Sequence, residues 1–182
     1  MKKTSKKKNK KKSNQIYEQY PASTVFIVSI LQLLVFVAGL YIMFTLHWIT
    51  GILFLIFLII LEIQLYREGC VNCCYYGKRC AFGKGIIASK FFKRGDPKIF
   101  RVRNLSWKDF IPQILVVAIP LVVGIALLIS RGFNVLILIA IVYPILSWFF
   151  LNNIIYGKLA CPHCKQGSIC CPALNFFDKS KK

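Results

Sequence analysis

The chain has 182 residues, of which 57% are hydrophobic, and a formal net charge of +19. A soluble domain of this length cannot bury so much apolar surface, so we expect the hydrophobic residues to face lipid. The basic residues must then lie outside the bilayer, next to water or anionic headgroups.

The chain opens on a lysine-rich segment, residues 1–23, which carries eight lysines. It reads as a disordered cytosolic tail that fixes topology and keeps the chain soluble. The alternative is attraction to anionic lipids, at about 1 kcal/mol per lysine near the surface. The lysines come without base-reading residues or a folded reader, so no specific nucleic-acid partner is expected.

Four apolar runs follow, and each is long enough to cross a membrane as a helix. They cover residues 24–44, 48–66, 110–129 and 133–156. About 20 residues cross ~30 Å of hydrocarbon at the helical rise, and none of the runs alternates as a barrel strand would. The short gaps inside each pair predict two antiparallel hairpins, residues 24–66 and 110–156. The expected fold is an all-α membrane protein with four transmembrane helices.

The positive charges predict the orientation of these helices. Of the 25 lysines and arginines, 24 lie in the N-terminal tail, in residues 67–109 or in residues 157–182, and the remaining one is Arg131. Because cytoplasmic loops carry the excess of lysine and arginine, both termini and the loop 67–109 should be cytosolic. We therefore expect a multi-pass protein of the cytoplasmic membrane, without a cleavable signal peptide.

Two cysteine clusters follow the two hairpins, "CVNCCYYGKRC" at 70–80 and "CPHCKQGSICC" at 161–171. Three cysteines of each cluster share the spacing C-x2-C-x6-C, and the two triplets are offset by 91 residues. The registered cysteines are Cys70, Cys73, Cys80, Cys161, Cys164 and Cys171, and the two outside the register are Cys74 and Cys170. A hairpin followed by a triplet thus occurs twice, which predicts a parallel repeat about an axis along the membrane normal.

The spacing within each triplet favours a metal site. A C-x2-C turn directs two sulfurs at one ion, and a third thiol six residues later can return to it. The loop 67–109 and the tail 157–182 are each near or below the ~40 residues under which a domain usually needs a metal or disulfide. Disulfides are rare in a reducing cytosol. We expect structural zinc on the six registered thiols, with Cys74 and Cys170 as auxiliary candidates; redox-active dithiols and unliganded thiols are the alternatives.

The identity and number of the metal sites stay open. Eight thiols could hold two iron–sulfur clusters, and Cys171 precedes a proline as in ferredoxin sequences, but the x6 spacing is wider than ferredoxin spacing and favours zinc. Because both triplets should lie at the same membrane face, six thiolates could hold two zinc ions by sharing two sulfurs. This hypothesis places the tail against the central loop; two independent sites are the alternative.

Two resemblances bear on these cysteines. The spacing of the six thiols resembles the binuclear zinc cluster of fungal transcription factors, which implies two zinc ions on six thiolates and does not carry DNA binding over. The segments "YYGKRCAFGKG", "FFKRGDPKIF", "SWKDFIP" and "CPHCKQGSICCPA" resemble a group of small four-span, multi-cysteine membrane proteins of archaea and anaerobic bacteria. That resemblance includes the six registered cysteines, leaves Cys74 and Cys170 outside its pattern, and implies no activity.

Few other residues point to chemistry. Glu62, near the end of the second apolar run, could be a proton relay or ion ligand, but snorkelling or pairing with loop cations is the favoured interpretation. The segment 89–103 interleaves aromatic residues with cations and should lie along the headgroups.

These features favour a non-enzymatic membrane scaffold or assembly subunit, with other membrane-protein subunits as possible partners. The alternatives are an electron-transfer or redox protein and, third, a protein of metal sensing or trafficking.

Overall fold

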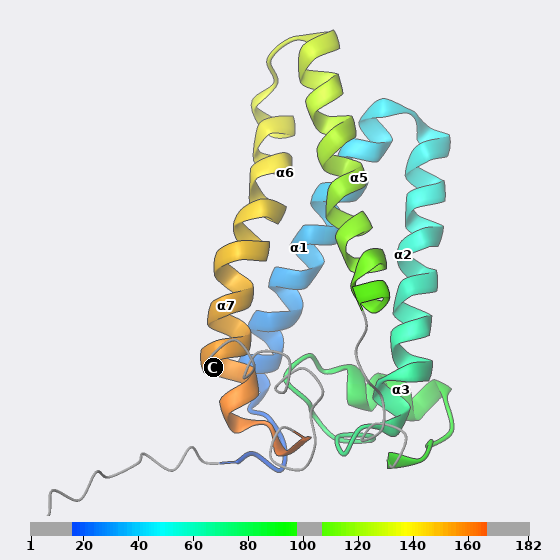
Figure 1. The fold of residues 1–182 in the computed structure, drawn as a ribbon, viewed down its shortest axis with the longest axis vertical. Helices are drawn as coiled ribbons and strands as arrows, with labels where there is room; N and C mark the ends of the chain where they lie inside the picture. Colours follow the sequence, from blue (N-terminus) through cyan, green and yellow to red (C-terminus); the bar gives the residue numbers. More distant parts are fainter. Residues whose placement is uncertain (1–15, 98–106, 167–182) are drawn as a thin grey trace, which may run out of the picture.

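Long helices make up most of the computed structural model, which describes residues 16–97 and 107–166 (Figure 1). Helices α1 (Ala22–Leu46), α2 (Trp48–Glu68) and α5 (Trp107–Arg131) each contain a stretch long and apolar enough to cross a membrane. No β-strand occurs in the described ranges. The prediction of an all-α membrane protein is therefore confirmed at this level.

A fourth helical column follows α5 and consists of several segments. They are α6 (Val135–Leu146), η2 (Ser147–Leu151), α7 (Asn152–Ile154) and η3 (Ile155–Ala160). They follow one another without a gap and run beside α1 in Figure 1. Pro144 lacks the N–H that would continue the backbone ladder, and wider π turns occupy η2 and η3. The apolar part of this column, Val135–Phe150, is shorter than the other three apolar helices, so a fourth complete crossing stays a prediction.

The turns between the helices lie at one end of the bundle. His47 alone separates α1 from α2, and its side chain accepts a hydrogen bond from the second helix's first turn. Asn134 caps α6 in the same way, accepting from two backbone N–H groups. The Arg131 guanidinium donates to the Thr45 carbonyl oxygen at 2.9 Å and so joins the two turns.

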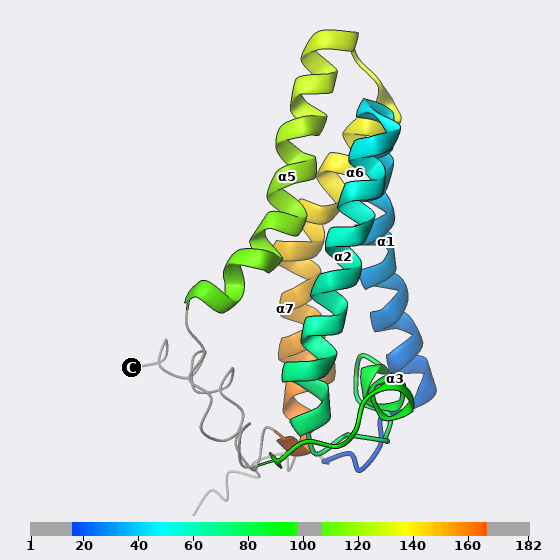
Figure 2. The ribbon, with the colours of Figure 1, turned by 90° about the vertical axis from the view of Figure 1, so that its right-hand side faces the viewer.

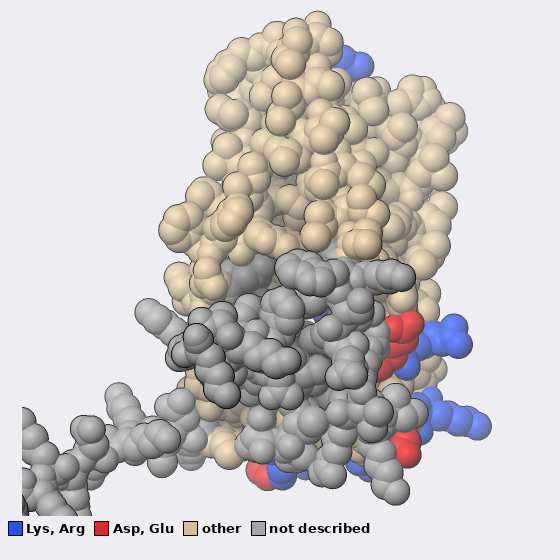
Figure 3. All heavy atoms as spheres, viewed as in Figure 1, with Lys and Arg blue, Asp and Glu red and all other residues tan. Residues whose placement is uncertain are grey.

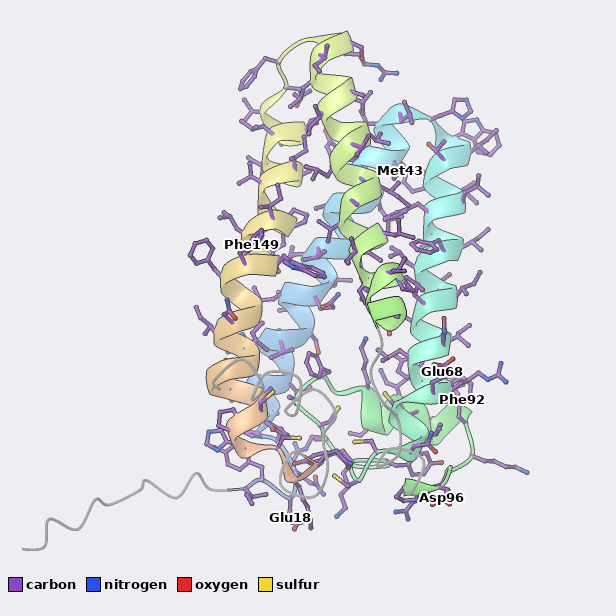
Figure 4. All side chains as sticks on the ribbon, in the orientation of Figure 1. Glu18, Met43, Glu68, Phe92, Asp96 and Phe149 are labelled. Carbon is purple, nitrogen blue, oxygen red and sulfur yellow. The ribbon has the colours of Figure 1, made fainter. Side chains whose placement is uncertain are left out.

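Helix α1 is central, because it packs against α2, α5 and α6. One buried cluster joins α1, α2 and α5 through Met43, Phe54, Leu58 and Val116. Most other large apolar side chains of the helices point outward, as Phe149 does in Figure 4. A thin core inside an apolar outer surface is what a bundle in lipid requires. In Figure 3 the upper part is almost free of charge, and charged atoms gather lower down.

The opposite end of the bundle carries three short segments that we call the thiol layer: residues 16–20, 69–97 and 161–166. It contains η1 (Cys70–Asn72), α3 (Lys84–Phe91) and η4 (Cys161–His163). Figure 2 shows α3 end-on while the long helices run vertically, so α3 lies across their axes. Gly85 allows this packing, since an added Cβ would lie 2.2 Å from the Tyr75 carbonyl oxygen.

Candidate thiol site

The described cysteines gather in the thiol layer, where the sulfur atoms appear at the lower end of Figure 4. None of them forms a disulfide, and each is half-buried; they are Cys70, Cys73, Cys74, Cys80, Cys161 and Cys164. Cys170 and Cys171 lie outside the described residues. The described cysteines of the two clusters thus reach the same end of the bundle, although helical segments separate the clusters in sequence.

The two C-x2-C segments adopt the same local conformation. Each starts with one 3₁₀ turn, in which the second cysteine donates its backbone N–H to the carbonyl oxygen of the first. The N···O distance is 3.3 Å from Cys73 to Cys70 and 3.2 Å from Cys164 to Cys161. The dihedral angles φ and ψ before the turns are −102° and −66° at Gly69, and −98° and −65° at Ala160. The shared spacing therefore corresponds to a shared turn geometry.

Direct hydrogen bonds join the central loop to the tail. The Gln166 side-chain oxygen accepts from the Cys74 backbone N–H at 3.0 Å and lies 3.9 Å from the Cys73 sulfur. The Lys165 backbone N–H donates to the Tyr75 hydroxyl at 2.9 Å. Gln166 is buried, so these bonds stabilise a closed contact between segments that are 90 or more residues apart.

Residues 16–20, which precede α1, complete this contact. The Tyr17 backbone N–H donates to the His163 carbonyl oxygen at 3.0 Å, and the Tyr17 carbonyl oxygen accepts from the Tyr75 hydroxyl at 2.6 Å. The rings of Tyr17 and His163 are stacked, with centroids 4.7 Å apart. Tyr17 therefore contacts the loop and the tail at once.

Tyr20 makes a second bridge of the same kind. Its side chain is only 1% exposed, its backbone N–H donates to the Arg79 carbonyl oxygen at 2.9 Å, and its hydroxyl donates to the Ala160 carbonyl oxygen. Tyr20 and Tyr75 belong to one buried cluster, against which four cysteines pack: Cys73, Cys74, Cys80 and Cys164. The join between loop and tail is thus an aromatic core with satisfied hydroxyl groups.

Ion pairs connect the layer to the helices and within itself. Glu62 of α2 pairs with Lys84 of α3 at 2.7 Å, and both side chains are mostly buried. Of the two favoured interpretations of Glu62, snorkelling or pairing with a loop cation, the structure shows the pairing. Glu18 pairs with Lys165, whose hydrogen bond is the main cause that lowers the pKa of the Glu18 carboxyl, and with Lys78 at 3.5 Å.

The surroundings of the thiols and hydroxyls change their acidity. The hydrogen bond from the Cys74 thiol is the main cause that lowers the pKa of Cys73 to about 7, and the backbone N–H groups of Tyr75 and Cys74 add to it against the effect of burial. The pKa of Cys74 is raised by the same contact. Burial raises the pKa of Tyr75 to about 12. The two thiols share one proton contact and titrate as a coupled pair.

The described side chains do not assemble a metal site on their own. Among residues 16–97 and 107–166, no group of three or more His, Cys, Asp or Glu side chains is arranged to hold a metal ion. The first triplet is described in full, whereas Cys171, the third member of the second triplet, lies outside these ranges. Cys73, Cys80 and Cys164 share the aromatic cluster, and Cys70 and Cys161 lie outside it.

Sequence reasoning missed the residues that join the layer. Tyr17, Tyr20, Tyr75 and Gln166 carry the contacts between segments, yet none belongs to a metal or catalytic motif. One available signal was the pair of tyrosines just before the first apolar run, since tyrosine is enriched at membrane interfaces.

Comparisons with known proteins give no relative: no family model, no curated protein and no solved structure matches this chain.

Proposed function

We propose that the chain is a multi-pass protein of the cytoplasmic membrane, with four crossings and with the thiol layer on the cytosolic side. The distribution of the cations supports this orientation. Arg131 is at the turn end of the bundle, whereas Lys78, Lys84, Lys93 and the other described cations of residues 69–97 are in the thiol layer. Lysine and arginine accumulate on the cytosolic side of membrane proteins.

Within this arrangement the thiol layer acts as a structural join, and the protein is a non-enzymatic scaffold or assembly subunit. The observation that carries this proposal is the set of bonds between segments distant in sequence, above all the Tyr75 hydroxyl. It donates to the Tyr17 carbonyl oxygen and accepts from the Lys165 N–H, so the loop, tail and N-terminal segment meet on one side chain. Polar groups used in this way fix the ends of the helices relative to one another.

Thiolate-bound zinc completes the join in this proposal. The residues that would hold it are the six registered cysteines, with Cys74 and Cys170 as auxiliary donors. Thiolates are the ligands that zinc prefers, and the two C-x2-C turns share one conformation at one end of the bundle. Bound zinc would add stability to a layer that is too small to rely on its own core; in zinc peptides binding contributes about 10–16 kcal/mol.

Metal analysis of protein purified without oxygen tests this proposal against its alternatives. A colourless sample that contains tightly held zinc supports the structural function. A brown sample with iron and labile sulfide supports the electron-transfer alternative. Zinc that a chelator removes within minutes, without loss of the folded state, supports metal sensing or trafficking. A folded sample without any metal contradicts the metal part of the proposal.

A further inference from the structure

Helix α3 lies across the axes of the spanning helices, at the end of the bundle that carries the thiol layer. In Figure 2 it lies beside the lower end of α1, on the far side of α2 from α5. Gly83, just before α3, approaches α1 so closely that an added Cβ would lie 2.9 Å from Val25 and 4.0 Å from Ser29. Ser29 is seven residues inside α1, which corresponds to about 10 Å along its axis.

The ion pair with α2 places the other side of α3 at a similar depth. The Lys84 ammonium is 2.7 Å from the Glu62 carboxylate, and Glu62 lies six residues before the end of α2, or about 9 Å along the axis. Helices that lie in the membrane interface bury their apolar face about 5–10 Å into the boundary between headgroups and acyl chains. The two contacts therefore hold α3 about 9–10 Å inside the ends of α1 and α2, which matches this depth.

The surface that α3 turns away from the bundle combines apolar side chains with cations. Gly85 and Ala88 are buried, whereas Ile87 and Phe91, one turn apart, are 42% and 76% exposed. Three cations follow on the last turn of α3 and just after it: Lys90, Lys93 and Arg94. All three are exposed, and none forms an ion pair with another described residue.

The segment that carries these cations contacts α2 and residues 71–76 of the thiol layer. The Phe92 ring stacks on Tyr66 with centroids 6.1 Å apart, and the Phe92 carbonyl oxygen accepts from the Tyr76 hydroxyl at 2.7 Å. The Gly95 backbone N–H donates to the Val71 carbonyl oxygen at 3.1 Å. Figure 4 shows Phe92 beside the lower end of α2. The cations are therefore held next to the exposed face of α3.

We propose that Ile87, Phe91, Lys90, Lys93 and Arg94 form a binding surface for anionic phospholipids of the leaflet next to the thiol layer. The two apolar side chains enter the acyl region, and the three cations bind headgroup phosphates. The occupant is a lipid because the surface lies on the outside of the bundle, close to the ends of the spanning helices, and the sequence 85–94 contains three cations and no acid. The residues of this surface are distinct from the lysine-rich leader, the segment of residues 1–23.

Lipid selectivity of the reconstituted full-length chain tests the proposal. Trace spin-labelled phosphatidylglycerol or phosphatidylcholine is added to phosphatidylcholine vesicles, and the fraction of probe immobilised by protein gives the selectivity for the anionic lipid. Each cation near the surface contributes about 1 kcal/mol, or roughly five-fold. The Lys90→Gln/Lys93→Gln/Arg94→Gln variant should lose the selectivity of this site by at least about five-fold, with the loss shrinking at high salt.

Two matched variants control for charge and for fold. Lys90→Arg/Lys93→Arg keeps the charge and should keep the selectivity. A leader variant that removes the same number of charges, Lys6→Gln/Lys7→Gln/Lys8→Gln, should lower it less than the α3 variant. If the α3 variant retains wild-type selectivity within about two-fold, or if the leader variant accounts for the whole effect, the proposal is wrong and an acidic protein becomes the better candidate for the patch.

A second measurement tests the depth of α3. In Phe91→Trp, the added tryptophan should be quenched by phospholipids brominated near the headgroup end of the acyl chain, after subtraction of the signal from the three native tryptophans. An added fluorescence that brominated lipid does not quench would show that Phe91 faces water and would overturn the proposed surface.

Discussion

Removing the hydroxyl of Tyr75 should open the join between the loop and the tail. Tyr75 is 2% exposed, and Phe fills the same space, so Tyr75→Phe changes hydrogen bonding with little change in packing. The Tyr17 carbonyl oxygen and the Lys165 N–H lose their partner, at 2.6 Å and 2.9 Å respectively. Each unsatisfied group costs about 1 kcal/mol or more. The free energy that favours the closed layer over the opened one should therefore fall by ~2 kcal/mol.

Hydrogen exchange of the Tyr17 amide measures this loss. Its acceptor, the His163 carbonyl oxygen, is untouched by the substitution, so faster exchange reports opening of the layer rather than a missing bond. Since 1.4 kcal/mol corresponds to a factor of ten, protection should fall roughly 30-fold. Tyr76→Phe is the matched control, because the Tyr76 hydroxyl bonds to Phe92 within the loop. Equal protection in Tyr75→Phe and Tyr76→Phe would refute the reasoning.

Three further predictions concern the helix contacts and the orientation. Glu62→Gln or Lys84→Met should each lower the free energy of unfolding in detergent by about 1–3 kcal/mol, because the remaining partner stays mostly buried. The double variant should lower it by less than the sum of the two single effects, and strictly additive effects would argue against coupling between the two side chains. Gly85→Ala should expose α3 to hydrogen exchange, since the new Cβ would lie 2.2 Å from a loop carbonyl oxygen; wild-type protection of α3 would contradict that packing. A reporter fused after Lys182 should be cytosolic, and an impermeant reagent should not label Cys80 in intact cells; labelling from outside would reverse the proposed orientation.

The helices could be predicted from sequence because lipid leaves few alternatives. Apolar runs of this length must satisfy their backbone groups internally, which selects helices regardless of tertiary contacts. The fourth run is the exception. Pro144 and the wider turns after it depend on local backbone geometry that apolar composition does not report, so the run appears in the structure as a segmented column.

Cysteine spacing predicted the local turns better than it predicted the site. The matched C-x2-C turns at Cys70 and Cys161 follow from short-range geometry, which the repeated spacing encodes. The meeting of Gln166 with Cys74, and of Tyr75 with Tyr17, joins residues 92 and 58 positions apart. No local pattern specifies such pairs, because they depend on how the helices place the ends of the loop and tail.

Metal counting on the Cys161→Ser/Cys164→Ser variant tests the central claim most directly, namely that the loop and the tail form one metal-stabilised join. Wild-type and variant protein are purified without oxygen, and zinc per chain is measured beside the folded fraction. A joint centre predicts that the variant loses all of its zinc, because the first triplet cannot complete tetrahedral shells alone. A variant that keeps a full equivalent on Cys70, Cys73, Cys74 and Cys80 would contradict the account and show two independent sites.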